Sequence, residues 1–339
     1  TDKCMPYDPS SSRQKIMEVE KIGALVYLPA EKKIETYAAD AMEAFEEIDA
    51  YWMQREGLLF YPFDRSKQAF FYGKKTVETS IKEFDLSPNE QLTQNEYETS
   101  VYMACAEMQE GDMDKVVLAR NEILTGSYDA KVSFQNAVKK YPNSFGYYVN
   151  IGPEEWVGAS PELLLHFEDG MIYTVALAGT KSLADEFTDK ERVEQAMVSE
   201  FIEEKLTKVG LSAFTKEDTE EATFGEIKHL KTTYTAQADK LKALELLKHL
   251  QPTSAVCGLP RDKSFGFIQE FETMNRSFYS GVTGVLREKS ATFFVNLRCM
   301  RFYQDKVELF AGAGITKDSN PASEWEETEK KIATIKELL

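Results

Sequence analysis

The chain has 339 residues, of which 42% are hydrophobic, so it can bury a large core as one big domain or as two. Its formal net charge of −17 argues against nucleic acid and against an anionic membrane as partners. No segment approaches the roughly 18 consecutive apolar residues of a membrane-spanning helix, and the first residues lack the apolar core of a signal peptide. The four cysteines form no Cys-x-x-Cys pair, so we expect reduced thiols and a cytoplasmic protein.

The N-terminal part of the sequence combines three predicted strands with one helix. Apolar patterns predict the strands 22–28, 57–63 and 69–77. A helix is predicted near 38–53, between the first two strands. Leu86-Ser-Pro-Asn89 is the one internal seam that the sequence offers. We therefore expect an N-terminal part over residues 1–90 and a second part over 91–339, combined in one compact structural domain.

Beyond the seam, helices and strands follow one another with short connections. Thr93 and Glu96 predict a capping box at the start of a helix that Gly111 ends. The later elements are predicted, in chain order, as strand 116–124, helix 132–141, strands 145–151, 156–159, 163–168 and 171–178, helices 189–208, 236–250 and 265–272, strands 281–287, 291–300 and 306–312, and a C-terminal helix. Asp169-Gly170 predicts a hairpin turn. Because a few residues join many of the strands, neighbouring strands must pair antiparallel. The sequence predicts an α+β fold with antiparallel sheets covered by helices.

The last strand and the last helix carry a candidate ligand site. Gly312 and Gly314 end an apolar strand, where the missing Cβ atoms let a ligand approach the backbone closely. Ser323 is the predicted N-cap of the helix that follows, and Glu326 completes a capping box.

Two pairs of glutamates with helical spacing are candidate metal ligands. Glu324 and Glu327 share one face of the C-terminal helix, and Lys331 lies one turn further along it. Glu191 and Glu194 repeat this spacing on the predicted helix upstream. Four carboxylates suffice for a hard divalent cation such as Mg²⁺. The alternative is a solvated helix face, because the same spacing recurs elsewhere in this acidic chain.

Three charged residues stand within or beside apolar strand patterns. Lys115 begins a strand that reads as buried, so it is either a solvated strand end or a base kept partly neutral by its surroundings. Glu162 precedes three leucines on a strand that we expect to be covered on both faces, where burial raises a carboxyl pKa and favours a general acid. Arg298 needs a partner if it is buried, and a substrate carboxylate suits its planar fork.

Eight motifs, taken together and in order, resemble the chorismate-utilising enzymes, a family that includes isochorismate, salicylate, anthranilate and aminodeoxychorismate synthases. The motifs are Lys-Val-Val-Leu-Ala-Arg, Ala-Ser-Pro-Glu, Leu-Ala-Gly-Thr, Lys-Glu-Arg-Val-Glu, Tyr-Ser-Gly, Leu-Arg, Ala-Gly-Ala-Gly and Glu-Trp-Glu-Glu-Thr. The resemblance covers roughly residues 95–339, whereas 1–90 resembles only the more variable N-terminal part of that fold. It implies the chorismate-binding fold, similar to anthranilate synthase component I, with residues 91–339 as its catalytic region.

The resemblance also implies a cofactor, a substrate and a set of site residues. Mg²⁺ would be bound by Glu194 and Glu327, with Glu191 and Glu324 assisting, and would hold the ring carboxylate of chorismate. The residues implied in substrate binding are Gly179, Thr180, Ala255, Val256, Tyr279, Leu297, Arg298, Gly312, Gly314 and Lys331.

Within the family, two positions indicate isochorismate synthase. A lysine at the position of Lys115 activates water to attack C2 of the ring, and Glu162 then protonates the departing C4 hydroxyl. Ala255 follows the isochorismate-synthase pattern, whereas Tyr279 is typical of salicylate synthases, so salicylate synthase is the alternative. Gln251 departs from the histidine usual before this Pro-Thr, and glutamine cannot carry a proton at neutral pH.

Anthranilate or aminodeoxychorismate synthase component I is a more distant alternative, and a catalytically silent binding module is a reading from another class. We expect no glutaminase subunit and a monomer or weak dimer. The choice between menaquinone and siderophore biosynthesis stays open.

Overall fold

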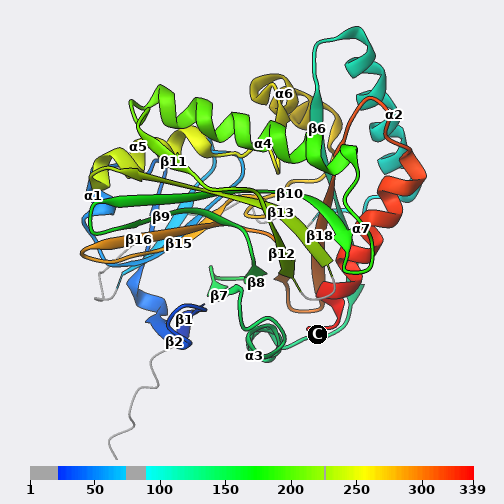
Figure 1. Ribbon diagram of the computed structural model, residues 1–339. Helices are drawn as coiled ribbons and strands as arrows, with labels where there is room; N and C mark the ends of the chain where they lie inside the picture. The colour runs from blue at the N-terminus through cyan, green and yellow to red at the C-terminus, as the bar shows by residue number, and fades with distance from the viewer. Residues whose placement is uncertain (1–21, 74–88, 225–226) are drawn as a thin grey trace, which may run out of the picture.

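The computed structural model describes residues 22–73, 89–224 and 227–339, and within them the strands form two antiparallel sheets (Figure 1). The first sheet runs, in spatial order, through β14 (Gly258–Leu259), β6 (Lys115–Thr125), β18 (Lys306–Ile315), β17 (Cys299–Phe302), β8 (Glu155–Ser160), β7 (Phe145–Asn150), β1 (Ile22–Leu28) and β2 (Lys33–Ala38). The second runs through β11 (Phe214–Lys216), β13 (Ile227–Gln237), β10 (Met171–Ser182), β9 (Leu163–Glu168), β16 (Ser290–Val295), β15 (Val282–Leu286), β4 (Gly57–Tyr61), β5 (Ala69–Gly73) and β3 (Met42–Phe45), while β12 (Glu220–Phe224) pairs with β13.

Helices cover the outer faces of both sheets. They are α1 (Ala50–Met53), α2 (Gln94–Glu110), α3 (Ala130–Lys140), α4 (Asp189–Lys208), α5 (Lys240–Leu250), α6 (Arg261–Phe271) and α7 (Pro321–Lys336). Helices α4 and α5 lie on the second sheet, against β10, β13 and β9, whereas α3 and α7 pack on the first (Figure 1). The predicted α+β class, with antiparallel sheets covered by helices, is confirmed. No helix in the described ranges is long and apolar enough to cross a membrane.

Aromatic side chains fill the space between the two sheets. Phe60 of the second sheet stacks on Phe278 with ring centroids 4.2 Å apart. Trp156 and Phe310 of the first sheet stack at 5.5 Å, and the Phe60 ring lies 6.0 Å from Trp156. Buried aromatic side chains dominate the energetics of a core, because each buries a large apolar area. The two sheets are therefore held face to face by one hydrophobic layer.

The N-terminal part differs from the sequence prediction at the helix expected near 38–53. That segment holds a 3₁₀ turn at Ala39–Ala41, then β3 and the four-residue α1. Met42 and Phe45 have helical spacing, but both are buried because β3 pairs with β5, and this pairing overrides the local pattern. The strand predicted at 69–77 is present over Ala69–Gly73, and its remainder lies outside the described residues.

Other elements confirm the prediction or shift its limits. The capping box of Thr93 and Glu96 begins α2, and Gly111 ends it in a left-handed conformation. Asp169-Gly170 forms the predicted hairpin turn between β9 and β10. The helix predicted from 236 begins only at Lys240, because Gln237 still pairs with Met171 of β10.

Three strands of the second sheet, β11, β12 and β13, were not predicted at all. Strand β13 mixes lysine and threonine with few apolar residues, so it lacks the hydrophobic signal of a strand, yet it pairs with β10 along its whole length.

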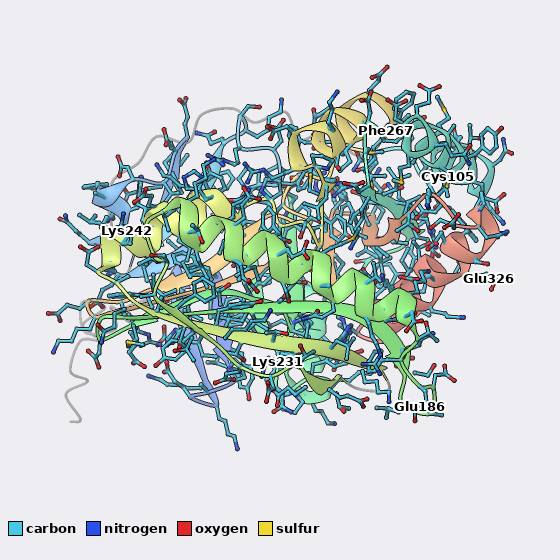
Figure 2. All side chains as sticks on the ribbon, turned by 45° about the horizontal axis from the view of Figure 1, so that its top comes forward. Cys105, Glu186, Lys231, Lys242, Phe267 and Glu326 are labelled. Carbon is cyan, nitrogen blue, oxygen red and sulfur yellow. The ribbon has the colours of Figure 1, made fainter. Side chains whose placement is uncertain are left out.

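Two further predictions near the C-terminus are wrong in detail. The strand expected at 291–300 is two strands, β16 and β17, which belong to different sheets, and the chain turns between them at Arg298 with φ 48°. The N-cap of α7 is Asn320, whose side chain accepts from the backbone N–H of Ser323, and Pro321 occupies the first turn. With Asn320 as the N-cap, Ser323 and not Glu326 stands three residues on, and Glu326 lies exposed on the outer side of α7 (Figure 2).

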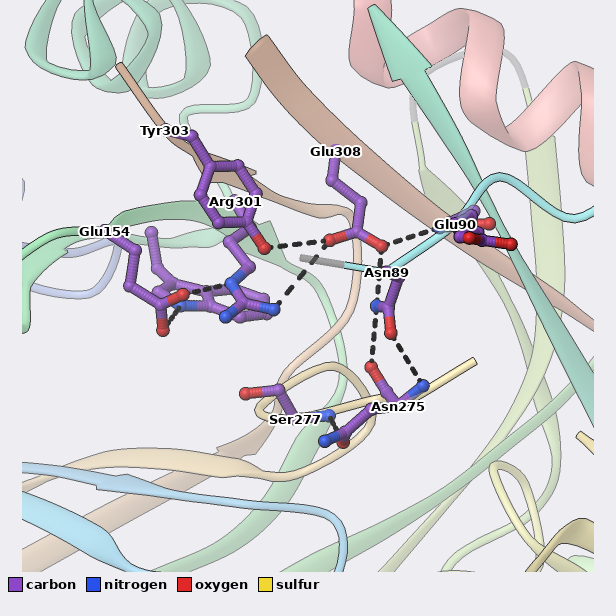
Figure 3. Close-up of polar contacts among 10 residues, drawn as sticks. Asn89, Glu90, Glu154, Asn275, Ser277, Arg301, Tyr303 and Glu308 are labelled. Carbon is purple, nitrogen blue, oxygen red and sulfur yellow. Dashed lines mark hydrogen bonds and ion pairs between the residues drawn. The ribbon is translucent and has the colours of Figure 1, made fainter. Parts of the chain in front are cut away.

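A buried polar network connects the first sheet to two loops (Figure 3). Arg301 of β17 bonds Glu154 and lies 3.9 Å from Glu308, and all three side chains are buried. Asn89 donates to Glu308 at 2.7 Å and to the carbonyl of Asn275 at 3.0 Å. The network therefore fixes Asn89, the last residue of the predicted seam, as well as the loop that leads to Tyr279.

Candidate active site

Lys115 lies at the meeting point of β6, β18 and α4. Its side chain is buried, which excludes the solvated alternative, and its Nζ donates to Glu194 Oε1 at 2.9 Å. Position 314 borders this pair, because a Cβ there would lie 3.0 Å from Lys115 Cε and 3.6 Å from Glu194 Oε1. Gly314 is therefore the small residue that leaves room for the amine and the carboxylate.

Glu162 lies close enough to Lys115 for the charge of the amine to act on its carboxyl. It lies in the short connection between β8 and β9, not on a strand as expected, and its backbone is fixed from both sides: its N–H donates to Ser160 Oγ and its carbonyl accepts from the N–H of Val295. Burial raises the pKa of the Glu162 carboxyl to about 7, while the charge of Lys115 opposes this rise. The carboxyl that the sequence predicts as a general acid therefore stands in a different local structure from the predicted strand.

A small pocket connects Glu162 with the loop that carries Ala255. Glu162, Thr253 and Ala255 line it together with apolar residues of β9 and α4. The side chain of Val256, next in that loop, is buried in the core instead, and its carbonyl accepts from Arg276. Gln251 donates to the carbonyl of Pro62 at 3.0 Å, so its side chain holds the end of β4.

The four candidate metal-binding carboxylates come from α4 and α7, and each contacts a partner within the protein. Glu194 pairs with Lys115; burial raises its pKa, but the Lys115 charge and hydrogen bond outweigh this and lower it. Glu324 is buried and accepts from Ser319 Oγ at 2.7 Å. Its pKa is raised by burial, with a further contribution from Glu327.

The other two carboxylates are held by lysines. Glu327 accepts from Lys331 at 2.7 Å. Glu191 lies 3.2 Å from Lys181 and forms the capping box of α4 with Thr188. Within the part of the chain that the structure describes, no three His, Cys, Asp or Glu side chains are close enough to hold a metal ion. Glu194 and Glu324 nevertheless both sense the charges of Lys190 and Lys331, so the two helices present their carboxylates to a common space.

Lys331 and Tyr279 meet at Gly312. The Lys331 amine donates to the Gly312 carbonyl at 2.7 Å. A Cβ at position 312 would lie 3.0 Å from the Tyr279 hydroxyl, whose ring stacks on Phe310. The glycine therefore lets a lysine and a tyrosine approach the same stretch of backbone.

Gly179, Thr180 and Leu297 are the remaining residues that the sequence implied in substrate binding. Gly179 has φ 70°, and a Cβ there would come within 2.9 Å of Glu191 Cβ, so the glycine also permits α4 to pack on β10. Thr180 pairs in register with His229 across β10 and β13. Leu297 packs against the core beside Arg298, in the turn between the two sheets.

His229 is a site residue that the sequence did not reveal. Its Nδ1 lies 3.2 Å from Thr180 Oγ1. Burial, together with the charges of Arg298 and Lys331, lowers the pKa of His229 to about 4, so the imidazole is neutral at physiological pH. Since β13 was not predicted, nothing in the sequence could place this histidine beside Thr180. The charges of both cations therefore reach the neutral ring of His229, while the Arg298 guanidinium itself lies over the Tyr141 ring, 5.6 Å from its centroid.

The chain matches the family model described as "Chorismate binding enzyme" over residues 51–339. It is 31% identical over 257 residues to isochorismate synthase MenF of Escherichia coli, which covers 70% of this chain and 59% of that protein. It is 30% identical over 259 residues to isochorismate synthase EntC of the same species, covering 71% of this chain and 66% of that protein. The chain therefore belongs to the family of chorismate-binding enzymes. It spans about three fifths to two thirds of the length of these relatives.

Solved structures show the same fold. The menaquinone-specific isochorismate synthase MenF from Escherichia coli superposes with a TM-score of 0.80 at 23% identity and covers 94% of this chain and 89% of that one. Anthranilate synthase component I from Streptococcus pneumoniae gives a TM-score of 0.72 at 17% identity, covering 98% of this chain and 94% of that one. The expected chorismate-binding fold is confirmed.

Proposed function

We propose that this chain is an isochorismate synthase, an isomerase that interconverts chorismate and isochorismate. The observation that carries the proposal is the buried amine of Lys115 within electrostatic reach of Glu162, whose carboxyl pKa of about 7 suits a general acid at neutral pH. The family match and the two isochorismate synthases at 30 and 31% identity support the same reaction.

In the proposed reaction, neutral Lys115 takes a proton from water as that water attacks C2 of the ring. Glu162 donates its proton to the hydroxyl that leaves from C4, so water is consumed and released once in each turnover. The step leaves an ammonium and a carboxylate, and both must exchange protons with solvent before the next cycle. Glu194, 2.9 Å from the amine, orients it.

Mg²⁺ is the proposed cofactor, and when bound it supplies positive charge to the ring carboxylate. Glu194 and Glu327 would hold it, with Glu191 and Glu324 assisting. Carboxylate oxygens suit this cation. The raised pKa of Glu324 beside Glu327 also fits, since a nearby cation relieves their repulsion.

Cations lie at the site beside the carboxylates, although the chain as a whole is acidic. In the proposed complex Arg298, Lys331, Tyr279 and Gly312 hold the enolpyruvyl carboxylate, and Gly179 lies against the ring. The effect of Arg298 and Lys331 on His229 supports this grouping. A dianionic substrate would then meet cations in a partly buried setting, where electrostatic attraction is stronger than in water.

Salicylate synthase, which also eliminates pyruvate, is the second candidate because of Tyr279. Ala255 beside Glu162 in the pocket favours isochorismate as the final product. We further propose a cytoplasmic enzyme that needs no glutaminase subunit and acts as a monomer or weak dimer, in menaquinone or siderophore biosynthesis.

The proposal is tested by incubating the pure protein with chorismate and Mg²⁺, without ammonia or glutamine, and separating the products by chromatography. Isochorismate, formed reversibly, is the expected product. Salicylate with pyruvate as the dominant products would replace the proposal with the second candidate. Anthranilate in a parallel reaction with ammonia would contradict the role of Lys115 as a base for water.

A further inference from the structure

Asn296 joins the two segments that carry Tyr279 and Arg298. It lies where the chain leaves β16 of the second sheet for β17 of the first, and its side chain is fully buried. Its N–H donates to the carbonyl of Gly281 at 2.8 Å, and its carbonyl accepts from the N–H of Ser280 at 2.8 Å. This reciprocal pair sets the two segments side by side.

The side-chain amide of Asn296 adds two hydrogen bonds. Nδ2 donates to the carbonyl of Phe278 at 2.8 Å, directly before Tyr279. Oδ1 accepts from the Tyr147 hydroxyl at 2.6 Å. The orientation of the amide is unambiguous, because a backbone carbonyl can only accept, so the nitrogen faces Phe278 and the tyrosine must donate. Burial raises the pKa of Tyr147, which keeps this donor protonated.

The bonded segments contain two residues in the left-handed backbone region. Ser280 has φ 62° and Arg298 has φ 48°. Side chains other than glycine rarely adopt this conformation, and it persists where the surroundings over-determine it. Asn296 bonds Ser280 directly and lies two positions before Arg298, so its four hydrogen bonds constrain the backbone beside both residues.

Tyr147 is itself fixed from β8. A Cβ at position 158 would lie 2.4 Å from its ring, so Gly158 provides the space in which the ring sits. Strand β7 thus holds the tyrosine whose hydroxyl orients Asn296.

We propose that Asn296, oriented by Tyr147, is a positioning residue that holds Tyr279 and Arg298 in the geometry that binds the substrate carboxylate. The inference rests on the proposed function. Asn296 does not touch the substrate itself, since its backbone and amide groups bond to protein. It acts through the two segments that it joins.

The test compares Tyr147→Phe with Tyr148→Phe. Both tyrosines are buried neighbours on β7, but their side chains point to opposite faces, and the Tyr148 hydroxyl bonds Glu155 instead. Each substitution removes one oxygen, so both proteins should fold. KM and kcat for chorismate, with direct calorimetric titration of chorismate, are measured for each.

Tyr147→Phe should raise KM about fivefold or more with a smaller change in kcat, because carboxylate binding is shared by ground state and transition state. Tyr148→Phe should leave both constants near wild type. Asn296→Leu should raise KM further, and combining it with Tyr147→Phe should add little, because both remove the same hydrogen bond.

Unchanged KM and affinity in Tyr147→Phe would overturn the inference, whatever happens to its melting temperature. If Asn296→Leu fails to fold, the comparison of Tyr147→Phe with Tyr148→Phe still tests the inference. A wild-type protein that binds chorismate but yields another product would overturn the proposed function while leaving this comparison intact. A wild-type protein that does not bind chorismate would overturn both.

Discussion

At the scale of single residues, Glu162 and Lys115 must each react in the protonation state that is the minor one in water. The carboxyl must carry a proton and the amine must lack one, and the reference pKa values are about 4.3 and 10.4. The structure meets the first requirement through burial, which raises the pKa of Glu162 to about 7. Lys115 is buried, and its Nζ donates to Glu194 Oε1 at 2.9 Å, so the proposed reaction requires the amine to give up this ion pair when it acts as a base.

The pKa of Glu162 predicts how the rate depends on pH. Because the acid must be protonated, kcat should fall as pH rises through about 7, and the same group should give the alkaline limb of a bell-shaped profile. Glu162→Gln should lose this limb and about 10²-fold or more in kcat. A full pH profile of both proteins checks this. An alkaline limb that persists unchanged in Glu162→Gln would assign it to another group.

The same pKa makes a prediction about stability. A carboxyl whose pKa is raised in the folded protein binds protons more tightly there than in the unfolded chain, so stability is lost as pH rises from about 4.5 to about 7. Glu162→Gln removes this effect. Its melting temperature relative to wild type should therefore be higher at pH 8 than at pH 5. An equal difference at both pH values would contradict the raised pKa.

Replacing Lys115 tests the water-activation step. Lys115→Ala should lower kcat on the order of 10²-fold or more, and combining it with Glu162→Ala should cost much less than the product of the two effects, since both act in one displacement. Rapid-quench and steady-state assays of the three variants provide the comparison. A near-normal kcat in Lys115→Ala would remove the main support for isochorismate synthase.

At the scale of elements, α7 is anchored on β6 by residues that lie next to its carboxylates. Arg120 of β6 donates to Thr328 at 2.6 Å and stacks over the Trp325 ring at 3.8 Å. Glu327 and Lys331 form a partly exposed pair on the site side. Partly exposed ion pairs contribute about 0–1 kcal/mol to the stability of the folded protein. Removing Glu327 can therefore test its role in activity without unfolding the protein.

Glu327→Ala should abolish turnover while changing the melting temperature little. Glu326→Ala, on the exposed outer side of the same helix, is the matched control and should keep wild-type activity. Activity assays with Mg²⁺ and thermal melts of both variants give the readout. Full activity in Glu327→Ala would show that its side chain is only part of a solvated helix face.

The elements also show how far the sequence could predict this fold. Helix α2 was predicted correctly because its capping box and terminal glycine are local signals. The segment 38–53 was predicted wrongly because pairing with β5, a distant strand, decides its conformation. Strand β13 carries few apolar residues, so its conformation depends on pairing with β10 and not on a local pattern. The sequence therefore offered no reason to place His229 at the site.

At the scale of the whole molecule, the antiparallel fold followed from short connections, but the meeting of distant residues did not. Lys115 and Glu194 are 79 positions apart and contact each other only because α4 packs on β10 while β6 lies beside β18. The resemblance to a family gave the candidate residues of the proposed site. The distances, the pKa of Glu162 and the positioning role proposed for Asn296 required the assembled sheets.

The proposed Mg²⁺ site predicts an enzyme that loses activity but not its fold when the metal is removed. Each of the four carboxylates has a hydrogen-bond or ion-pair partner within the protein, so no structural element depends on the cation for its charge balance. Treatment with EDTA should therefore abolish turnover and leave the melting temperature nearly unchanged, and adding Mg²⁺ should restore the rate. This behaviour differs from that of structural zinc sites, where metal binding and folding are one equilibrium. Cooperative unfolding in EDTA at the assay temperature would place the metal in the fold, whereas full activity in EDTA would exclude a catalytic role for it.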